Sequence, residues 1–298
     1  VKQRTPNARL VNQVNSLKPS VQDVTDIISE YPGLSQYTFN SIRSQEYQKK
    51  MKKSHHLKYS PHLQDLYYKR YREGVSKGRQ YILLDMAEEV GLSLALLARI
   101  ILEKHLAVTH RDGEIISRSF VTQLMKEPNL IEDPILATEI SQCIYSDDFY
   151  GPLTDSIKHA IGYEYEVKLK RQLGKLGHSF IGEDQMRLKG YDKTPDVKLE
   201  IPIAVDGYIV NWIESKASFG DDFSHKTYLK DQFWSYWNRF GPGMVIYWFG
   251  FIEDLDVNQE KGIILRHELP ENIVTMNPLD ESAPDKMTGT SGFVPDKA

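Results

Sequence analysis

The feature that most constrains the fold of this chain is the Asp206-Gly207 pair and the two apolar runs on either side of it. Residues 195–205 and 208–217 alternate between apolar and polar side chains over much of their length. Asp-Gly is a preferred pair in two-residue hairpin turns, because it tolerates the positive φ angles that such turns require. We therefore predict two antiparallel strands joined by a tight turn.

Three charged residues are expected on this hairpin. Glu214 and Lys216 lie two residues apart on the second strand, so they share a face, and Asp196 begins the first strand. With unbroken pairing around the turn, Asp196 would lie opposite residue 217 and point away from the other two. One extra residue in the first strand would place it opposite Lys216. Because Pro202 cannot donate to the ladder, we predict a bulge or bend there.

This predicted cluster has the chemistry of a site for a hard divalent cation. Two carboxylates within reach of one point supply oxygen ligands of the kind that Mg²⁺ binds at about 2.0–2.1 Å. The ammonium of Lys216 beside them would position a water molecule or stabilise charge that develops on a reacting phosphate. Such charges cost stability on a half-buried sheet unless they are paired, which favours a functional role.

The second half of the chain has the pattern of an α/β domain. A helix is predicted over residues 153–176, ending at Gly177. Strands are predicted at 195–205, 208–217, 244–251 and 262–269, with a helix at 224–240 between the second and the third. This order indicates an α/β domain over residues 151–276 that begins at Gly151-Pro152. Residues 277–298, rich in Ser, Pro, Asp and Gly, are predicted to be a disordered tail.

Residues 1–150 have the pattern of an all-helical region with two helix-turn-helix-like units. The usual spacing is a small residue, a glycine four positions later and an apolar residue six positions after that. It occurs at two places, which are Ser29-Gly33-Phe39 and Ala87-Gly91-Leu97. The helix after the second unit, residues 94–106, is mostly Leu, Ile and Ala, so we expect it to lie in the core.

The helix after the first unit is the better candidate for binding nucleic acid. Eleven Lys or Arg residues and three Asp or Glu residues lie between Thr38 and Arg79, although the whole chain has a net charge of −4. Ser35 is expected to cap this helix. The candidate nucleic-acid-binding residues are Arg43, Gln45, Lys49, Lys50, Lys52 and Lys53. The alternative is a solvated helical face without a partner.

Two further features limit the class of protein. No run of eighteen apolar residues occurs, so no membrane-spanning helix is expected. The single cysteine, Cys143, cannot form an internal disulfide, which favours a reducing compartment. No base or zinc-ligand pattern surrounds it in the sequence, so we expect it to lie in the core.

Pro195-Asp196, followed by Glu214-Ser215-Lys216, resembles the motif of the PD-(D/E)XK nucleases. The resemblance implies a restriction-endonuclease-like core, which is a mixed sheet flanked by helices in the order helix, three strands, helix and strand. Here this core follows the all-helical region with its helix-turn-helix units. The resemblance implies Mg²⁺ or Mn²⁺ bound by Asp196, Glu214, the Ser215 carbonyl and Glu166. Lys216 would orient the attacking water.

Two positions on the neighbouring helices support the resemblance. The family often has a glutamate on the preceding helix; Glu166 fits best, although Glu164 competes and Glu166 could be a solvated position. Many members have Gln-x-x-x-Tyr on the following helix, and Gln232 and Tyr236 match it one turn apart. Gln232 would position substrate or water, and Tyr236 would support it; the alternative is that both simply bond to backbone.

Further stretches are similar to the animal codanin-interacting nucleases. They are Ser44–Lys49, Thr194–Asp196, Trp212–Gly220 and Asp231–Gly243. This resemblance implies codanin as a partner, nucleic acid as the substrate, and a location in nucleus and cytoplasm. Two alternatives stay open: a catalytically idle adaptor that binds codanin or DNA, and a DNA-binding regulator that acts through the basic helix alone.

The residues just after the motif have two interpretations. Asp221, Asp222 and His225 could bind a second metal ion, or they could belong to the start of the next helix. We favour the second interpretation, with Ser224 as the capping residue.

Overall fold

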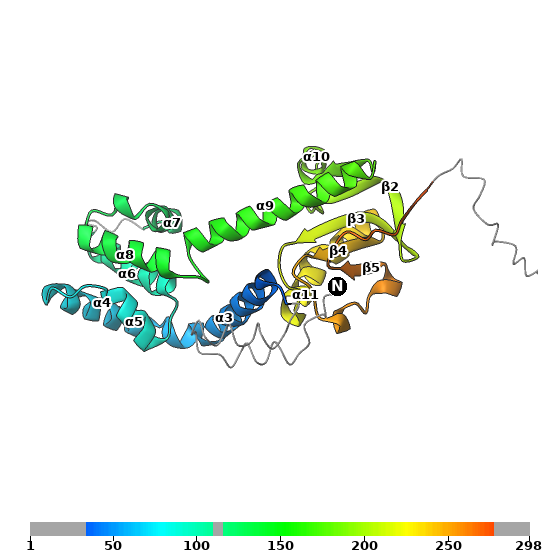
Figure 1. Cartoon of the computed structure of the whole chain (residues 1–298). Helices are drawn as coiled ribbons and strands as arrows, with labels where there is room; N and C mark the ends of the chain where they lie inside the picture. The colour runs from blue at the N-terminus through cyan, green and yellow to red at the C-terminus, as the bar shows by residue number, and fades with distance from the viewer. Residues whose placement is uncertain (1–33, 110–115, 277–298) are drawn as a thin grey trace, which may run out of the picture.

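A computed structural model describes residues 34–109 and 116–276, which form a helical part and a sheet-containing part (Figure 1). Helix α9, Pro152–Lys175, runs from one part to the other. Ser29 and Gly33 of the first helix-turn-helix-like unit lie outside the described residues, and so does the predicted tail, 277–298. Within the described residues, no helix is both long enough and apolar enough to span a membrane.

The helical part is built from six α-helices and one short 3₁₀ turn in the described residues. They are α3 (Gln36–Lys58), α4 (Pro61–Ser76), α5 (Ile82–Val90), α6 (Leu94–Thr109), α7 (Arg118–Lys126), the turn Pro128–Leu130 and α8 (Pro134–Ser146). Helix α3 begins as predicted, because Ser35 Oγ accepts a hydrogen bond from the Thr38 backbone N–H at 3.0 Å. A free N–H in the first turn is thereby satisfied.

The core of the helical part lies around α6. Gly91 adopts a φ of +63° at the end of α5, a conformation that favours glycine, and α6 starts three residues later. Leu97, Ile101 and Leu102 of α6 are fully buried, and Cys143 of α8 packs in the same core. The prediction that α6 is a core helix is therefore confirmed, and so is the buried position of the cysteine.

The sheet is mixed, and its strands follow the predicted α/β order. They are β1 (Phe180–Gly182), β2 (Val197–Val205), β3 (Tyr208–Lys216), β4 (Gly243–Tyr247), β5 (Ile263–Arg266) and β6 (Ile273–Thr275). Their order across the sheet is β1-β2-β3-β4-β5, and β6 pairs with β2. The β3-β4 and β4-β5 pairs are parallel and the other pairs are antiparallel. The short strands β1 and β6 and helix α10 (Glu183–Leu188) were not predicted.

The hairpin turn is where the sequence places it, but the irregularity in β2 is larger than predicted. Asp206 and Gly207 have φ angles of +51° and +85°. Val205 pairs with Tyr208, whereas Lys198 pairs with Trp212, so β2 contains three extra residues between these pairs instead of one. On its other edge β2 pairs with β1 at its start and with β6 near the turn, so the irregular segment lies where its partner changes. Because three is an odd number, like the one extra residue predicted, Asp196 still lies on the same face of the sheet as Glu214 and Lys216.

Helices cover both faces of the sheet (Figure 1). Leu169 and Leu173 of α9 are buried on one face against Val197, Ile213 and Met244. The opposite face is covered by α11 (Asp222–Tyr228), a π-helical turn (Leu229–Phe233) and α12 (Trp234–Phe240). These three pieces replace the single helix predicted at 224–240.

Trp212 marks the second face of the sheet. Its ring packs in one cluster with Phe233 and Tyr236. Gly243 on the neighbouring strand is required here, because a Cβ at that position would lie 2.0 Å from the Trp212 ring. Since side chains alternate along a strand, Glu214 shares this face with Trp212.

Candidate active site

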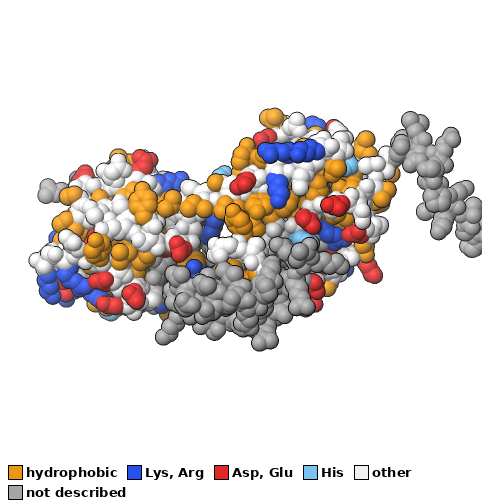
Figure 2. Space-filling model, viewed as in Figure 1, with side chains coloured by type: hydrophobic (Ala, Val, Ile, Leu, Met, Phe, Trp, Pro, Cys, Tyr) orange, Lys and Arg blue, Asp and Glu red, His pale blue; other side chains and the backbone are white. Residues whose placement is uncertain are grey.

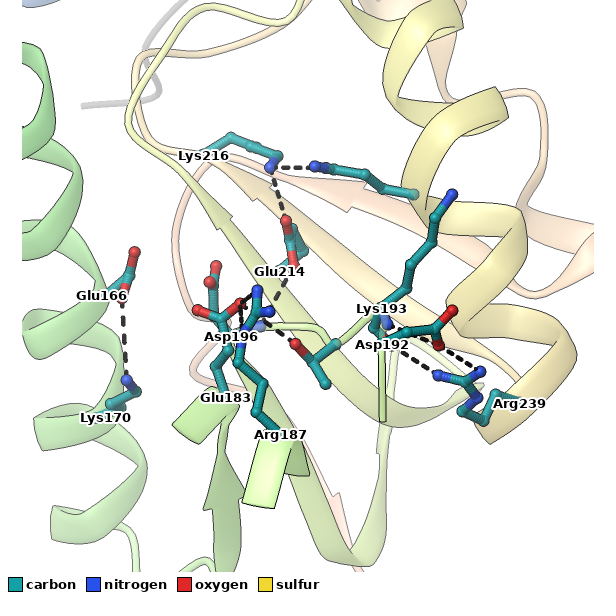
Figure 3. A network of polar contacts seen from close by, with 12 residues as sticks. Glu166, Lys170, Glu183, Arg187, Asp192, Lys193, Asp196, Glu214, Lys216 and Arg239 are labelled. Atoms are coloured by element: carbon teal, nitrogen blue, oxygen red, sulfur yellow. Dashed lines mark hydrogen bonds and ion pairs between the residues drawn. The ribbon is translucent and has the colours of Figure 1, made fainter. Parts of the chain in front are cut away.

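Asp196 and Glu214 lie next to each other at the start of β2 and on β3 (Figure 3). The Asp196 backbone N–H donates to Glu214 Oε2 at 3.3 Å, and Asp196 Oδ2 accepts from the Ser215 backbone N–H at 2.7 Å. Continuing the observed register places Asp196 opposite Glu214, not opposite Lys216 as predicted. The extra residues in β2 therefore bring the two carboxylates directly together.

Lys216 is held by groups from two elements. Its Nζ atom lies 2.6 Å from Glu214 Oε1 and donates to Gln232 Oε1 at 3.0 Å. Gln232 belongs to the π-helical turn, and the ammonium also lies 4.6 Å from the centroid of the Tyr228 ring of α11. These contacts fix the ammonium beside the two carboxylates.

Burial dominates the electrostatics of this cluster. It raises the pKa of Asp196, and the neighbouring Glu214 charge raises it further. Burial also raises the pKa of Glu214, although the Lys216 ammonium opposes this effect. Burial lowers the pKa of Lys216, but the charge and hydrogen bond of Glu214, together with the charge of Asp196, outweigh burial, so that pKa is raised. The cluster thus favours an added positive charge, because it contains two carboxylates and one ammonium.

Glu166 of α9 faces this cluster from the side. Burial raises its pKa, and the Asp196 charge contributes in the same direction. Its Oε2 lies 3.9 Å from Lys170 Nζ, and its side chain is 31% exposed. Glu164, the competing residue, is exposed.

Glu183 is a further carboxylate beside Asp196 that sequence reasoning missed (Figure 3). It begins α10, accepts from Thr194 Oγ1 at 3.2 Å and pairs with the Arg187 guanidinium. Its charge contributes to the raised pKa of both Asp196 and Glu214. No motif identifies this glutamate, because only the pairing of β1 with β2 brings it here.

Gln232 and Tyr236 have different environments. The side-chain oxygen of Gln232 contacts Lys216, so this residue reaches the cluster. Tyr236 is buried, and its ring meets the Trp212 ring edge-on with centroids 5.3 Å apart. Tyr236 therefore supports the face that positions the cluster, mainly by packing.

Residues 221–225 belong to a helix start, as we favoured, but the capping residue is different. Asp221 Oδ1 accepts from the Ser224 backbone N–H at 2.6 Å, so Asp221 is the N-cap of α11 and Ser224 is not. His225 Nδ1 lies 3.0 Å from the Tyr247 hydroxyl in the core. Ser224 lies inside the first turn of α11, where its N–H is one of the donors that a cap must satisfy.

A divalent cation such as Mg²⁺ needs several oxygen ligands that converge on one point. Among the residues that the structure describes, no group of three or more His, Cys, Asp or Glu side chains has metal-binding geometry. Asp196 and Glu214 nevertheless suit Mg²⁺ or Mn²⁺ chemically, because they are a half-buried and a buried oxygen donor whose negative charges repel each other. Ser215 and Glu166 lie beside them.

The six candidate nucleic-acid-binding residues of α3 divide into two sets. Gln45 Nε2 donates to the Phe219 carbonyl at 2.7 Å, and Lys49 Nζ lies 3.0 Å from Asp221 Oδ2. Arg43 lies 4.9 Å from the centroid of the Phe149 ring. The other three are exposed, namely Lys50, Lys52 and Lys53.

Comparisons with known proteins give a consistent result. Residues 132–269, which include Thr194-Pro195-Asp196, match a family described as "Protein of unknown function TPD sequence-motif". A Xenopus laevis protein named "CDAN1-interacting nuclease 1" is 51% identical over 264 residues, covering 88% of this chain and 86% of the relative. The Homo sapiens protein of that name is 50% identical over 262 residues, with coverages of 88% and 92%. The Gallus gallus protein is 45% identical over 261 residues, with coverages of 87% and 91%. No solved structure matches the chain.

Proposed function

This chain belongs to the family of CDAN1-interacting nucleases, and from that premise we propose that it is a metal-dependent nuclease that hydrolyses phosphodiester bonds. The observation that carries the proposal is the meeting of Asp196, Glu214 and Lys216 at one buried point. A fold retains such a cluster at a cost in stability, and hydrolysis of a phosphodiester accounts for each of its groups.

Asp196 and Glu214 would hold Mg²⁺ or Mn²⁺, together with the Ser215 carbonyl and Glu166. A bound divalent ion supplies an acidified water and positive charge near the phosphate. The chain itself contributes an ammonium at Lys216, which orients the attacking water or neutralises charge on the phosphate. Gln232 holds that ammonium in place through its side-chain oxygen.

The arrangement of elements supports a restriction-endonuclease-like core. Helix α9, strands β1, β2 and β3, helices α11 and α12, and strand β4 occur in the order that the family resemblance implies, with the short helix α10 inserted between β1 and β2. On this basis we assign residues 151–276 to the nuclease domain and the described residues before them, 34–109 and 116–150, to a helical domain.

Partner binding is the second candidate function, and one surface favours it. Leu153, Ile157 and Tyr163 of α9 are 37%, 51% and 63% exposed. Figure 2 shows hydrophobic side chains in a band along α9. An exposed apolar band is typical of a protein-interaction surface, and the names of the relatives make codanin its expected partner. In a catalytically idle adaptor, this surface would be the functional one.

One experiment tests the nuclease proposal. Purified chain is incubated with labelled single- and double-stranded DNA and RNA, in Mg²⁺, Mn²⁺ or EDTA. We expect cleavage that needs the ion and is lost in Glu214→Gln. The matched control is Glu200→Gln, which removes an exposed carboxylate from the same sheet and should still cleave. Absence of cleavage with every substrate and ion, together with codanin binding that Ile157→Asp abolishes, would favour the adaptor.

A further inference from the structure

Helix α3 contacts the loop that follows Lys216. This loop, residues 217–221, is called the motif loop below, and it connects β3 to α11. Ser41 Oγ accepts from the Phe219 backbone N–H at 2.8 Å, and Gln45 Nε2 donates to the Phe219 carbonyl at 2.7 Å. Both backbone groups of one loop residue are therefore bound by side chains of a helix more than 170 positions earlier in the chain.

An ion pair adds a third contact one helical turn further along α3. Lys49 Nζ lies 3.0 Å from Asp221 Oδ2, and the Asp221 side chain is only 4% exposed. Glu46 on the same helix lies 2.6 Å from Lys49 Nζ and orients the ammonium. Removing Lys49 would leave a buried carboxylate without its counter-charge, which is far more costly than losing an exposed ion pair.

The motif loop is also fixed from its other side. The Gly220 backbone N–H donates to the Gly250 carbonyl at 2.9 Å, and the Gly220 carbonyl accepts from the Ile252 N–H at 3.0 Å. The loop therefore lies between α3 and the segment after β4, and contacts from both sides restrict its backbone. Figure 1 shows α3 passing beside α11 at this point.

Two groups of the proposed active site depend on this loop. The first is Lys216, which directly precedes the loop. The second is Gln232, because Asp221 at the end of the loop caps α11, and α11 leads into the π-helical turn that carries Gln232. The contact between Lys216 Nζ and Gln232 Oε1, at 3.0 Å, joins the residue before the loop to a residue after it. A displacement of the loop would therefore separate the ammonium from the oxygen that holds it.

We propose that Gln45 and Lys49 are positioning residues that fix the motif loop and thereby hold Lys216 against Gln232. The proposal rests on the proposed nuclease function for its effect on rate, but not for its effect on the loop. It gives Gln45 and Lys49 a role inside the molecule that differs from the phosphate contacts predicted for them from sequence. A role in the geometry of the site changes turnover, whereas a phosphate contact changes mainly binding.

The test compares variants that break or keep the ion pair. Lys49→Met removes the charge and keeps most of the length, and Lys49→Arg keeps the charge. Asp221→Asn removes the other charge but keeps an oxygen to cap α11. The matched control is Lys104→Met, which breaks the 2.7 Å ion pair with Asp65 in the helical part. Ile140→Val, in the helical core, controls for a general loss of stability.

Two measurements are made on the full chain. Hydrogen exchange of the amides in residues 217–232 reports on the loop without any need for activity. We expect faster exchange there in Lys49→Met, and wild-type exchange in Lys49→Arg and both controls. In steady-state cleavage assays, we expect Lys49→Met to lower kcat by roughly ten- to a hundredfold, with KM within a factor of two. The double variant Lys49→Met with Asp221→Asn should lower kcat little more than either single variant does, because both changes break the same ion pair.

Two outcomes would overturn the proposal, and a third would overturn only the nuclease function on which its effect on rate rests. Unchanged hydrogen exchange in residues 217–232 of Lys49→Met would show that Lys49 does not fix the motif loop. Unchanged kcat with a raised KM and a weaker salt dependence would indicate that Lys49 binds phosphate, as predicted from the sequence. A wild-type chain that cleaves nothing would refute the nuclease proposal, and the exchange result would then still decide whether α3 fixes the loop.

Discussion

The backbone N–H of Asp196 donates to the carboxylate of Glu214 at 3.3 Å. This contact places two acidic side chains next to each other in a buried position, where their charges repel. The ammonium of Lys216 pairs with Glu214 at 2.6 Å, and its charge only partly offsets the raised pKa of Asp196. The arrangement therefore costs stability at neutral pH in the absence of a cation, and that cost leads to the first prediction.

Asp196→Asn should stabilise the fold at pH 7.5 and abolish cleavage. Burial and Glu214 raise the folded pKa of Asp196 above its unfolded value, so its ionised form destabilises the fold once the pH exceeds about 3.9. An asparagine removes that charge and can still accept from the Ser215 N–H. We expect the free energy of unfolding to rise by about 1 kcal/mol or more in EDTA.

The measurement is urea denaturation in EDTA and again in Mg²⁺. Mg²⁺ should stabilise the wild type and have little effect on Asp196→Asn, because the ion loses a ligand. The control Asp254→Asn removes an exposed carboxylate and should change neither curve. A less stable Asp196→Asn in EDTA would show that the two carboxylates do not repel each other in the fold.

Local patterns in the sequence predicted the parts of the site that depend on local structure. The Asp206-Gly207 turn needs only two residues with positive φ, and strand periodicity alone places Glu214 and Lys216 on one face. The odd number of extra residues in β2 follows from the same reasoning, because the carboxylates can meet in no other way. Their actual number, three, depends on strands β1 and β6, which are too short to give a clear pattern.

The parts that were missed depend on tertiary contacts. Glu183 reaches Asp196 only because β1 pairs with β2, and a glutamate at the start of a short helix carries no signal of its own. The sequence predicts a surface for nucleic acid at Gln45 and Lys49 because their partners, Phe219 and Asp221, lie far away in the sequence. A basic helix has the same composition whether its lysines face phosphate or a carboxylate of the same chain.

Gly220→Ala should destabilise the fold by roughly 1–3 kcal/mol. A Cβ at this position would lie 2.7 Å from Phe251 Cβ and 3.0 Å from the Tyr247 ring, so the motif loop would have to move. Gly162→Ala in α9 is the matched control, and it should stabilise the fold. Nothing lies within 4 Å of its Cβ position, and alanine favours the helix by about 0.5–1 kcal/mol. Thermal denaturation of both variants checks the prediction, and equal effects would contradict it.

His225 should make the fold less stable as the pH falls from about 6.5 towards 4. Burial lowers its folded pKa to about 4, while the nearby Asp222 charge only partly opposes this effect. Between the two pKa values the unfolded chain binds more protons than the folded chain, so stability rises with pH. The slope from this residue is at most about 1.4 kcal/mol per pH unit.

The measurement is the difference in unfolding free energy between wild type and His225→Gln over that pH range. Glutamine can still bond to the Tyr247 hydroxyl but does not titrate, so the difference should change with pH. His267→Gln, on an exposed side chain, serves as the control for removing an imidazole. A flat difference for His225→Gln would mean that the fold does not lower the pKa of His225.

The exposed lysines of α3 give the last prediction, because they are still available to a polyanion after Gln45 and Lys49 are assigned to the motif loop. If Lys50, Lys52 and Lys53 each contact one phosphate, changing all three to alanine should weaken binding to every sequence alike. The slope of log affinity against log salt concentration should fall by about 3. A triple variant at α4 changes the net charge equally, with Lys69→Ala and Arg72→Ala in the helix and Lys77→Ala at its C-cap, and it should leave the slope close to that of the wild type. Equal losses in both triple variants would show that the basic excess attracts nucleic acid without a defined surface, since a general field depends on net charge and not on which helix carries it.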